Sequence, residues 1–132
     1  MADKQQEMEE IMNNYKMLET RLDTLAKQRE VVAKNIAEIR ATIDSITEIE
    51  NSNEMLFAIG RGAFVKGRTL DKKNVLVNIG AEVFIEKSAE DGKKSMEARQ
   101  QEFEKVFGQI EKEMINISSL LEQLNLKMQT LL

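Results

Sequence analysis

The residue types that most often carry catalysis or hold metal ions are scarce in this sequence. Its 132 residues include no histidine and no cysteine, which excludes imidazole and thiol catalysis, disulfides and the common zinc sites. A cluster of carboxylates at Glu7, Glu9 and Glu10 is better explained as the solvated face of a helix than as a metal site. We therefore predict a protein that is not an enzyme and that binds no metal ion.

A glycine-rich stretch, GRGAFVKG at 60–67, could be mistaken for a phosphate-binding loop. It lacks the Gly-Lys-Ser/Thr ending of a Walker A motif, and it leads into a strand rather than a helix. The turns of β-hairpins explain these glycines better. We expect no nucleotide and no other cofactor.

The composition favours long, thin helices over a globule. Aromatic residues make up 5% of the chain and charged residues 32%, against about 25% charged residues in ordinary globular domains. The net charge of −4 argues against an electrostatic nucleic-acid binder. The charged start, MADKQQEMEE, does not resemble a signal peptide, and no apolar run approaches the roughly 18 residues of a membrane span. We expect a cytoplasmic protein that binds neither nucleic acid nor membrane.

The N-terminal segment predicts one long coiled-coil helix. Residues 1–50 contain neither glycine nor proline, and their apolar residues recur in alternating steps of three and four, as in a left-handed coiled coil. Arg29 occupies the one break in this series, where it could fix the register of the coil, although we expect its side chain to reach toward water. The apolar series is Met8, Ile11, Tyr15, Leu18, Leu22, Leu25, Val32, Ile36, Ile39, Ile43 and Ile46.

A second helical segment is expected from Ser88 to the end of the sequence. Ser88 with Asp91 three residues later resembles a capped helix start. The two helical segments are nearly equal in length, so a chain that reverses between them can pair them antiparallel, with Leu18 near Leu120. The apolar series of the second segment is Met96, Phe103, Val106, Ile110, Met114, Ile117, Leu120, Leu124 and Leu131.

The middle of the chain predicts two β-hairpins. Four short β-rich runs at 55–59, 63–66, 75–79 and 83–87 are separated by turn residues. LFAIGRGAFVKG at 56–67 aligns with LVNIGAEVFIEK at 76–87, so each copy is interpreted as a hairpin with turns at Gly60, Gly62 and Gly80. The expected domains are an N-terminal coiled-coil helix (1–53), a two-hairpin module (54–87) and a C-terminal coiled-coil helix (88–132).

Two apolar surfaces remain without a partner in this arrangement. An isolated hairpin is marginally stable, so the hairpin residues are expected to bury themselves against other chains. The distal ends of the two helices are rich in methionine and leucine, which suits adaptable contacts with varied apolar partners, although the same residues could simply close the coil. The expected oligomerisation residues are Leu56, Phe57, Ile59, Phe64, Val65, Leu76, Val77, Ile79, Phe84 and Ile85. The expected client-binding residues are Met8, Ile11, Met12, Tyr15, Ile117, Leu121, Leu124, Leu126, Met128, Leu131 and Leu132.

The stretch VLVNIGAEVFIEKSAED at 75–91 resembles the α-class subunits of prefoldin, whose comparable region follows the pattern V-L-V-x-I/V-G-x-x-Y/F-x-V/I-E-K-S/T-x-E-D/E. Two hairpins also fit the α class, because β-class subunits carry one. The resemblance implies a mainly α fold with a small β module, in which a long antiparallel coiled coil is joined by two hairpins that form β-barrels with other subunits. It further implies a hexamer of two α-class and four β-class subunits.

The same resemblance implies a function. Such hexamers capture unfolded polypeptides without nucleotide, using coiled coils that project from the barrels, and pass them to a group II chaperonin. The competing interpretation is a structural or tethering coiled-coil protein, whose helix ends would engage one defined partner instead of varied clients.

Overall fold

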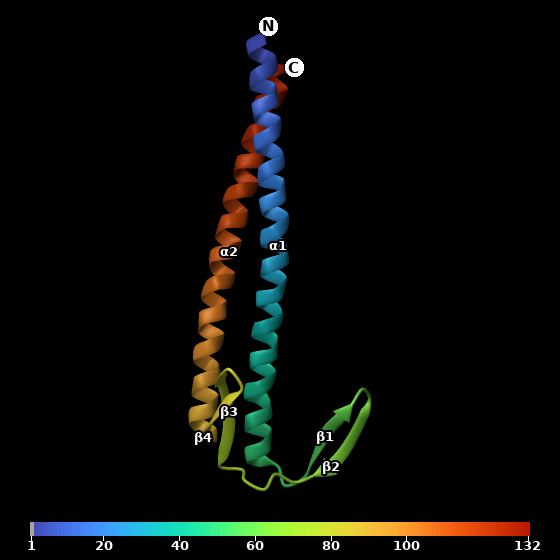
Figure 1. Ribbon diagram of the computed structural model, residues 1–132, viewed down its shortest axis with the longest axis vertical. Coiled ribbons are helices and arrows are strands. Elements are labelled where there is room, and N and C mark those ends of the chain that lie inside the picture. The colour runs from blue at the N-terminus through green and yellow to red at the C-terminus, as the bar shows by residue number, and fades with distance from the viewer. Residues whose placement is uncertain (1) are drawn as a thin grey trace. The chain divides into compact units, whose positions relative to one another are not determined.

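The computed structural model describes the chain from Ala2 to Leu132, with side chains from Asp3 onward, as two long helices flanking two antiparallel β-hairpins (Figure 1). This confirms the predicted fold class of a mainly α chain with a small β module. Within the described residues, no helix has both the length and the apolar character needed to cross a bilayer. The elements are α1 (Ala2–Asn51), β1 (Met55–Gly60), β2 (Ala63–Gly67), β3 (Asn74–Gly80), β4 (Val83–Ser88) and α2 (Ala89–Leu131).

The chain divides into two compact units. The first, called the arm unit here, contains the described residues up to Asn35 together with Phe103–Leu132. The second, called the hairpin unit, contains Ile36–Glu102 and therefore both hairpins with the adjoining parts of the two helices.

In the arm unit the two helices pair antiparallel through the predicted apolar seam. Leu25 is 1% exposed, and Ile11 and Val32 of α1 are also buried. Val32 borders the same groove as Ile110, whereas Leu18, earlier in α1, borders a groove with Leu120 and Leu124, later in α2. The predicted proximity of Leu18 and Leu120 is therefore confirmed. Burial of this seam holds together two helices that are each too narrow to fold alone.

The seam of α2 differs from the predicted one at two positions. Val106 is 42% exposed and Leu120 is 45% exposed, whereas the neighbouring Phe107 and Leu121 are half-buried. With Phe107 and Leu121 the apolar residues from Phe103 to Leu124 keep strictly alternating steps of four and three, whereas the predicted series has two consecutive steps of four and two of three. Strict heptad periodicity therefore favours the observed positions. Burying a phenylalanine ring removes more apolar surface from water than burying valine, which favours the observed choice at the first position.

The two hairpins share one pairing scheme. Met55 pairs with Gly67 in the first hairpin and Val75 with Lys87 in the second, so the 20-residue sequence repeat is also a repeat of register. Each ladder shifts its register once near its turn, between Ala58 and Gly60 and between Asn78 and Gly80. Such shifts are β-bulges, which bend and twist a hairpin.

The turns of the two hairpins differ in backbone conformation. Gly62 has a positive φ of 77° in the first turn, and Gly80 has a φ of 122° in the second, whereas Gly60 ends β1 without a positive φ. The second turn also places two residues other than glycine, Ala81 and Glu82, at φ values of 48° and 60°. Positive φ at both central residues is the geometry of a type I′ turn, which suits the twist of a tight hairpin.

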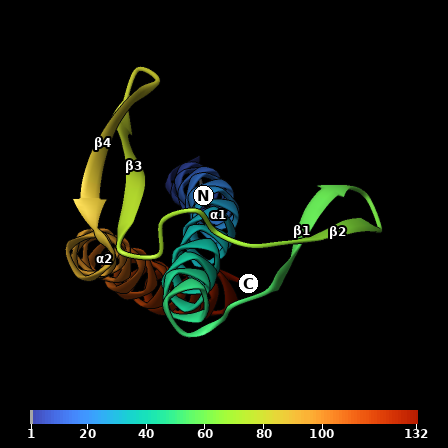
Figure 2. The same ribbon diagram turned by 90° about the horizontal axis from the view of Figure 1, so that it is seen from below.

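The second hairpin is attached to the start of α2 (Figure 2). The guanidinium of Arg99 donates a hydrogen bond to the carbonyl oxygen of Asn78 at 2.7 Å, and Val77 is 3% exposed. The backbone N–H of Ala89 donates to the carbonyl oxygen of Lys73 at 2.7 Å. The predicted cap of α2 is present, because Ser88 Oγ accepts a hydrogen bond from the N–H of Asp91 at 3.1 Å.

A glycine in α2 permits this close approach. A Cβ atom built on Gly92 would lie 2.5 Å from Cγ2 of Val75 in β3, whereas a Cβ on Gly108 would meet nothing within 4 Å. Gly92→Ala should therefore lower the stability, because the overpacking cost of about 1–3 kcal/mol exceeds the gain of about 1 kcal/mol in helix propensity. Gly108→Ala, the matched control, should raise the stability by about 1 kcal/mol. Urea unfolding followed by circular dichroism measures both, and equal stabilisation by the two variants would contradict the packing of β3 on α2.

Candidate functional site

The first candidate surface lies on the two hairpins. Eight of the ten expected oligomerisation residues are exposed in the chain, Phe57 is half-buried, and Val77 is buried within the hairpin unit itself. Val77 therefore supports the attachment of the second hairpin to α2 and is not available at the surface. The eight exposed residues are Leu56, Ile59, Phe64, Val65, Leu76, Ile79, Phe84 and Ile85.

Cross-strand pairing shows which of these side chains share a face. Residues that pair across a ladder point to the same side of the sheet, as do residues two apart along a strand. In the first hairpin Leu56 pairs with Lys66 and Ala58 with Phe64, so these four residues share one face. In the second hairpin the corresponding face carries Leu76, Glu86, Asn78 and Phe84. These two faces hold the largest exposed apolar side chains of the hairpins.

The segment between the hairpins is ordered by polar contacts. Asp71 accepts hydrogen bonds from the side-chain amide of Asn74 at 3.0 Å and from the N–H of Lys73 at 2.8 Å. These bonds favour the ionised carboxylate and hold the pKa of Asp71 below its usual value. Lys72 Nζ donates to Asn53 Oδ1 at 2.7 Å, which ties the connection to the segment after α1.

The second candidate surface lies on the arm unit, where the expected client-binding residues differ in exposure. Ile11 and Ile117 are 6% and 5% exposed, so they close the coil. Met12, Leu126 and Leu132 are exposed. The remaining six, Met8, Tyr15, Leu121, Leu124, Met128 and Leu131, are half-buried at the edge of the seam. Sequence reasoning therefore grouped side chains that the coil holds in place with side chains that are free to meet a client.

Two apolar grooves lie between the helices of the arm unit. One has a volume of about 290 Å³ and is bordered by Leu18, Leu120 and Leu124, with Asn14, Gln123 and Lys127 at its polar rim. The other has a volume of about 460 Å³ and is bordered by Val31, Val32, Val106 and Ile110, together with Thr24, Lys27 and Gln28. Exposed apolar residues are therefore found along the length of the arm unit as well as at its ends.

Sequence analysis assigned no role to Val31, although the sequence carried a signal. Val31 precedes the seam residue Val32, and an apolar residue directly beside a seam position lies outside the heptad pattern. It is 61% exposed in the structure. Met17 and Ile115, at 70% and 68%, are likewise exposed apolar residues outside the seam.

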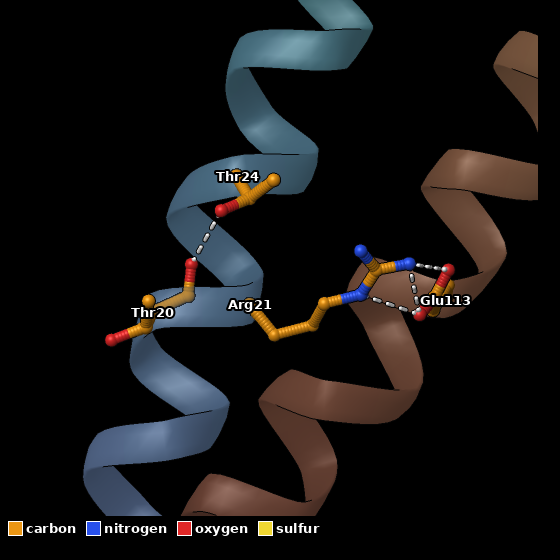
Figure 3. Close-up of polar contacts among 4 residues, drawn as sticks. All are labelled: Thr20, Arg21, Thr24 and Glu113. Carbon is orange, nitrogen blue, oxygen red and sulfur yellow. Dashed lines mark hydrogen bonds and ion pairs between the residues drawn. The ribbon is translucent and has the colours of Figure 1, made fainter.

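An ion pair links the two helices of the arm unit between these grooves (Figure 3). Arg21 Nε lies 3.1 Å from Glu113 Oε1, and Arg21 Nη2 lies 3.3 Å from Glu113 Oε2. Both side chains are nearly half exposed, so the pair contributes at most about 1 kcal/mol. Its two parallel bonds set the register of the helices more than their stability. Also on α1, Thr24 Oγ1 donates to the carbonyl oxygen of Thr20 at 3.0 Å.

The described residues do not bring together a group of three or more acidic side chains that could hold a metal ion. Arg29 is half-buried beside the seam. What the geometry offers chemically is therefore apolar contact surface, on the hairpin faces and along the arm unit, bordered by charged and amide side chains.

Comparison with known proteins places the sequence among related chains. A family model described as "Prefoldin subunit" matches residues 18–132. Prefoldin subunit alpha 1 of Thermococcus kodakarensis is 31% identical over 106 residues, which cover 78% of this chain and 73% of the relative. Prefoldin subunit alpha of Pyrococcus horikoshii is 30% identical over 111 residues, which cover 81% of this chain and 75% of the relative.

The fold also resembles that of a solved structure. A chain from the cryo-EM structure of filamentous PFD from Methanocaldococcus jannaschii superposes with a TM-score of 0.71 at 16% sequence identity. The alignment covers 90% of this chain and 98% of that chain. The arrangement of two helices around two hairpins is thus shared across most of both proteins.

Proposed function

Because the chain belongs to the prefoldin family, we propose that this prefoldin chaperone subunit works in the cytoplasm without ATP and captures unfolded polypeptides. In this proposal two copies join four β-class subunits in a hexamer, and the hexamer delivers its clients to a group II chaperonin. The hairpin faces bind the other subunits, and the arm unit binds the client.

The observation that carries the client-binding proposal is the set of apolar side chains left exposed on the arm unit. Met12, Met17, Ile115 and Leu126 are each at least 45% exposed, although they lie on helices whose seam is otherwise buried or half-buried at most positions. Single exposed apolar residues are normal on protein surfaces, but here they accompany two apolar grooves. Methionine adds adaptability, because its unbranched side chain accepts partners of different shape.

An estimate of affinity explains why such a protein works as an assembly. Burying two or three apolar side chains yields roughly 3–9 kcal/mol, and association costs about 4–15 kcal/mol. One arm unit would therefore hold a client weakly. Several arm units in one complex raise the effective concentration of client-binding sites. Together they can hold a client that a single arm unit would release.

The proposal predicts that capture does not depend on nucleotide. The purified complex should suppress the aggregation of a chemically unfolded test protein equally with and without ATP, because the glycine-rich segment 60–67 forms a β-hairpin and not a phosphate loop. Light scattering during dilution from denaturant measures this, and an inert protein at equal mass serves as the control. ATP hydrolysis by the pure complex, or capture that requires ATP, would contradict the proposal.

A structural or tethering role is the second candidate. It is favoured by the deep burial of Ile11 and Ile117, which closes the coil in the segments where client contacts were expected. A tether would bind one partner at fixed stoichiometry. Competition among unrelated unfolded proteins for the same complex separates the two functions, because only a general chaperone subunit shows it.

A further inference from the structure

A second line of side chains runs along α1 beside the seam. Met17, Thr24 and Val31 lie seven residues apart, each one position before a seam residue, and Thr20 lies between the first two. These four residues, called the side stripe here, are all exposed. They border two hollows that share Thr24. One is the groove of about 460 Å³ that contains Val31, and the other, of about 440 Å³, contains Met17 and Thr20.

The two threonines of the side stripe are more apolar toward a partner than their residue type suggests. Thr20 Oγ1 donates a hydrogen bond to the carbonyl oxygen of Lys16 at 3.0 Å. Thr24 Oγ1 donates in the same way to Thr20, also at 3.0 Å (Figure 3). Because both hydroxyl protons are used within α1, the methyl groups are what these side chains offer to an outside partner. The side stripe therefore presents apolar groups at steps of three, four and seven, the spacing by which one helix packs on another.

The charged residues beside the side stripe are all cationic. Lys16, Arg21 and Lys27 border the two hollows, and no carboxylate of the described residues does, although the net charge of the chain is −4. Arg21 is paired with Glu113. Lys27 pairs with Asp23 on its own helix at 3.2 Å, but both side chains are more than two-thirds exposed, and such a pair is weak enough to be exchanged. Within the described residues, the ammonium of Lys16 forms no ion pair.

We propose that the side stripe binds a third helix, supplied by a partner protein, whose apolar residues recur at steps of three and four between flanking carboxylates. The carboxylates complement the cations that border the hollows. A helix is favoured over an extended segment, because the described part of the arm unit is helical throughout and offers no strand edge to an extended backbone. The same stripe of a second copy is disfavoured, since it would bring Lys16 and Lys27 against like charges.

This inference goes beyond the proposed function. The site lies on the side of α1, and it takes a folded amphipathic helix instead of an unfolded polypeptide. From Met17 to Val31 the side stripe extends for about 21 Å at 1.5 Å per residue, which matches about four turns of a bound helix.

The test measures the binding of two synthetic peptides to the full chain by fluorescence anisotropy. Both peptides are amphipathic helices with leucine at alternating steps of three and four, and one carries glutamate beside the leucines where the other carries lysine. The glutamate peptide should bind at least about tenfold more tightly, and its affinity should fall as salt is added. Lys16→Glu with Lys27→Glu should reverse this preference.

Lys105→Glu with Lys112→Glu is the matched control. It makes the same change in net charge at two exposed positions of α2, seven residues apart, that border neither hollow. The control should keep the preference of the wild type. Equal affinity of the wild type for the two peptides, or an unchanged preference in the variant of Lys16 and Lys27, would overturn the inference.

A second pair of variants tests the role of the threonine methyl groups. Thr20→Ser with Thr24→Ser keeps both hydroxyls and removes both methyl groups, so it should weaken binding of the glutamate peptide by up to about fifteenfold. Thr20→Val with Thr24→Val keeps a methyl group at each position and should bind at least as tightly as the wild type. A serine variant that binds like the wild type while the valine variant binds more weakly would contradict an apolar contact at these residues.

A third variant tests whether the side stripe is available to a partner. Met17→Ser with Val31→Ser should abolish measurable binding of the glutamate peptide, and the native mass of the protein should stay unchanged because both residues are exposed outside the seam. A loss of native mass would show that another copy of the chain already covers the side stripe, and it would overturn the inference.

Discussion

Replacing Phe64 or Phe84 with aspartate is expected to dissociate the oligomer while leaving the helices folded. Both rings are more than half exposed in the single chain, at 59% and 57%, so their loss costs the isolated chain little. At a subunit contact, a carboxylate buried without a partner costs several kcal/mol. That is enough to weaken assembly by more than about a hundredfold at 1.4 kcal/mol per factor of ten. Native mass and far-ultraviolet circular dichroism measure the two properties.

Ala81→Asp is the matched control for this experiment. It introduces the same charge in the second hairpin but at a turn residue with a φ of 48°, a conformation that aspartate tolerates better than most residues. The control should assemble normally. Unchanged native mass for Phe64→Asp and Phe84→Asp would mean that the hairpin faces are not the subunit contact.

Replacing Met12, Ile115 and Leu126 together with serine is expected to abolish most client capture while the complex still assembles. All three are exposed on the arm unit, so neither the seam nor the hairpin unit depends on them. Each loss removes about 1.5–3 kcal/mol of potential apolar contact per side chain, and the losses compound across the copies in a complex. The ratio of complex to client needed to suppress aggregation should rise at least about tenfold.

The control variant replaces an asparagine directly next to each of these three, namely Asn13, Asn116 and Asn125, with serine. These asparagines are exposed on the same helix segments, so the control makes the same number of serine substitutions without removing apolar surface. It should capture clients normally. If the serine variant of Met12, Ile115 and Leu126 assembles and suppresses aggregation at the wild-type stoichiometry, the client site lies elsewhere. The groove bordered by Val31 and Val106 would then be the next surface to change.

The exposed residues of the arm unit replace a broader set that the sequence suggested. Helical periodicity placed Ile11 in the seam and Met12 beside it, but the expected client-binding set combined both kinds of residue. The difference matters for experiments, because replacing Leu121 or Met128, both half-buried beside the seam, would weaken the coil as well as any client contact.

The amino-acid sequence alone determined the secondary structure of this protein and the order of its elements. Fifty residues without glycine or proline and with a steady heptad pattern permit little except a helix, and α1 spans Ala2–Asn51. The repeat at 56–67 and 76–87 likewise predicted both hairpins with the observed 20-residue offset in pairing. These features depend on interactions between residues close in sequence, which local patterns record directly.

Tertiary structure alone decided which of several equivalent residues became buried. Val77 is buried in its own unit, and Gly92 admits β3 against α2. At these positions the local sequence pattern did not show which partner surface the segment would meet. The choice depended on the shape of an element distant in sequence, because apolar burial and close packing are properties of two surfaces together and neither surface specifies them by itself.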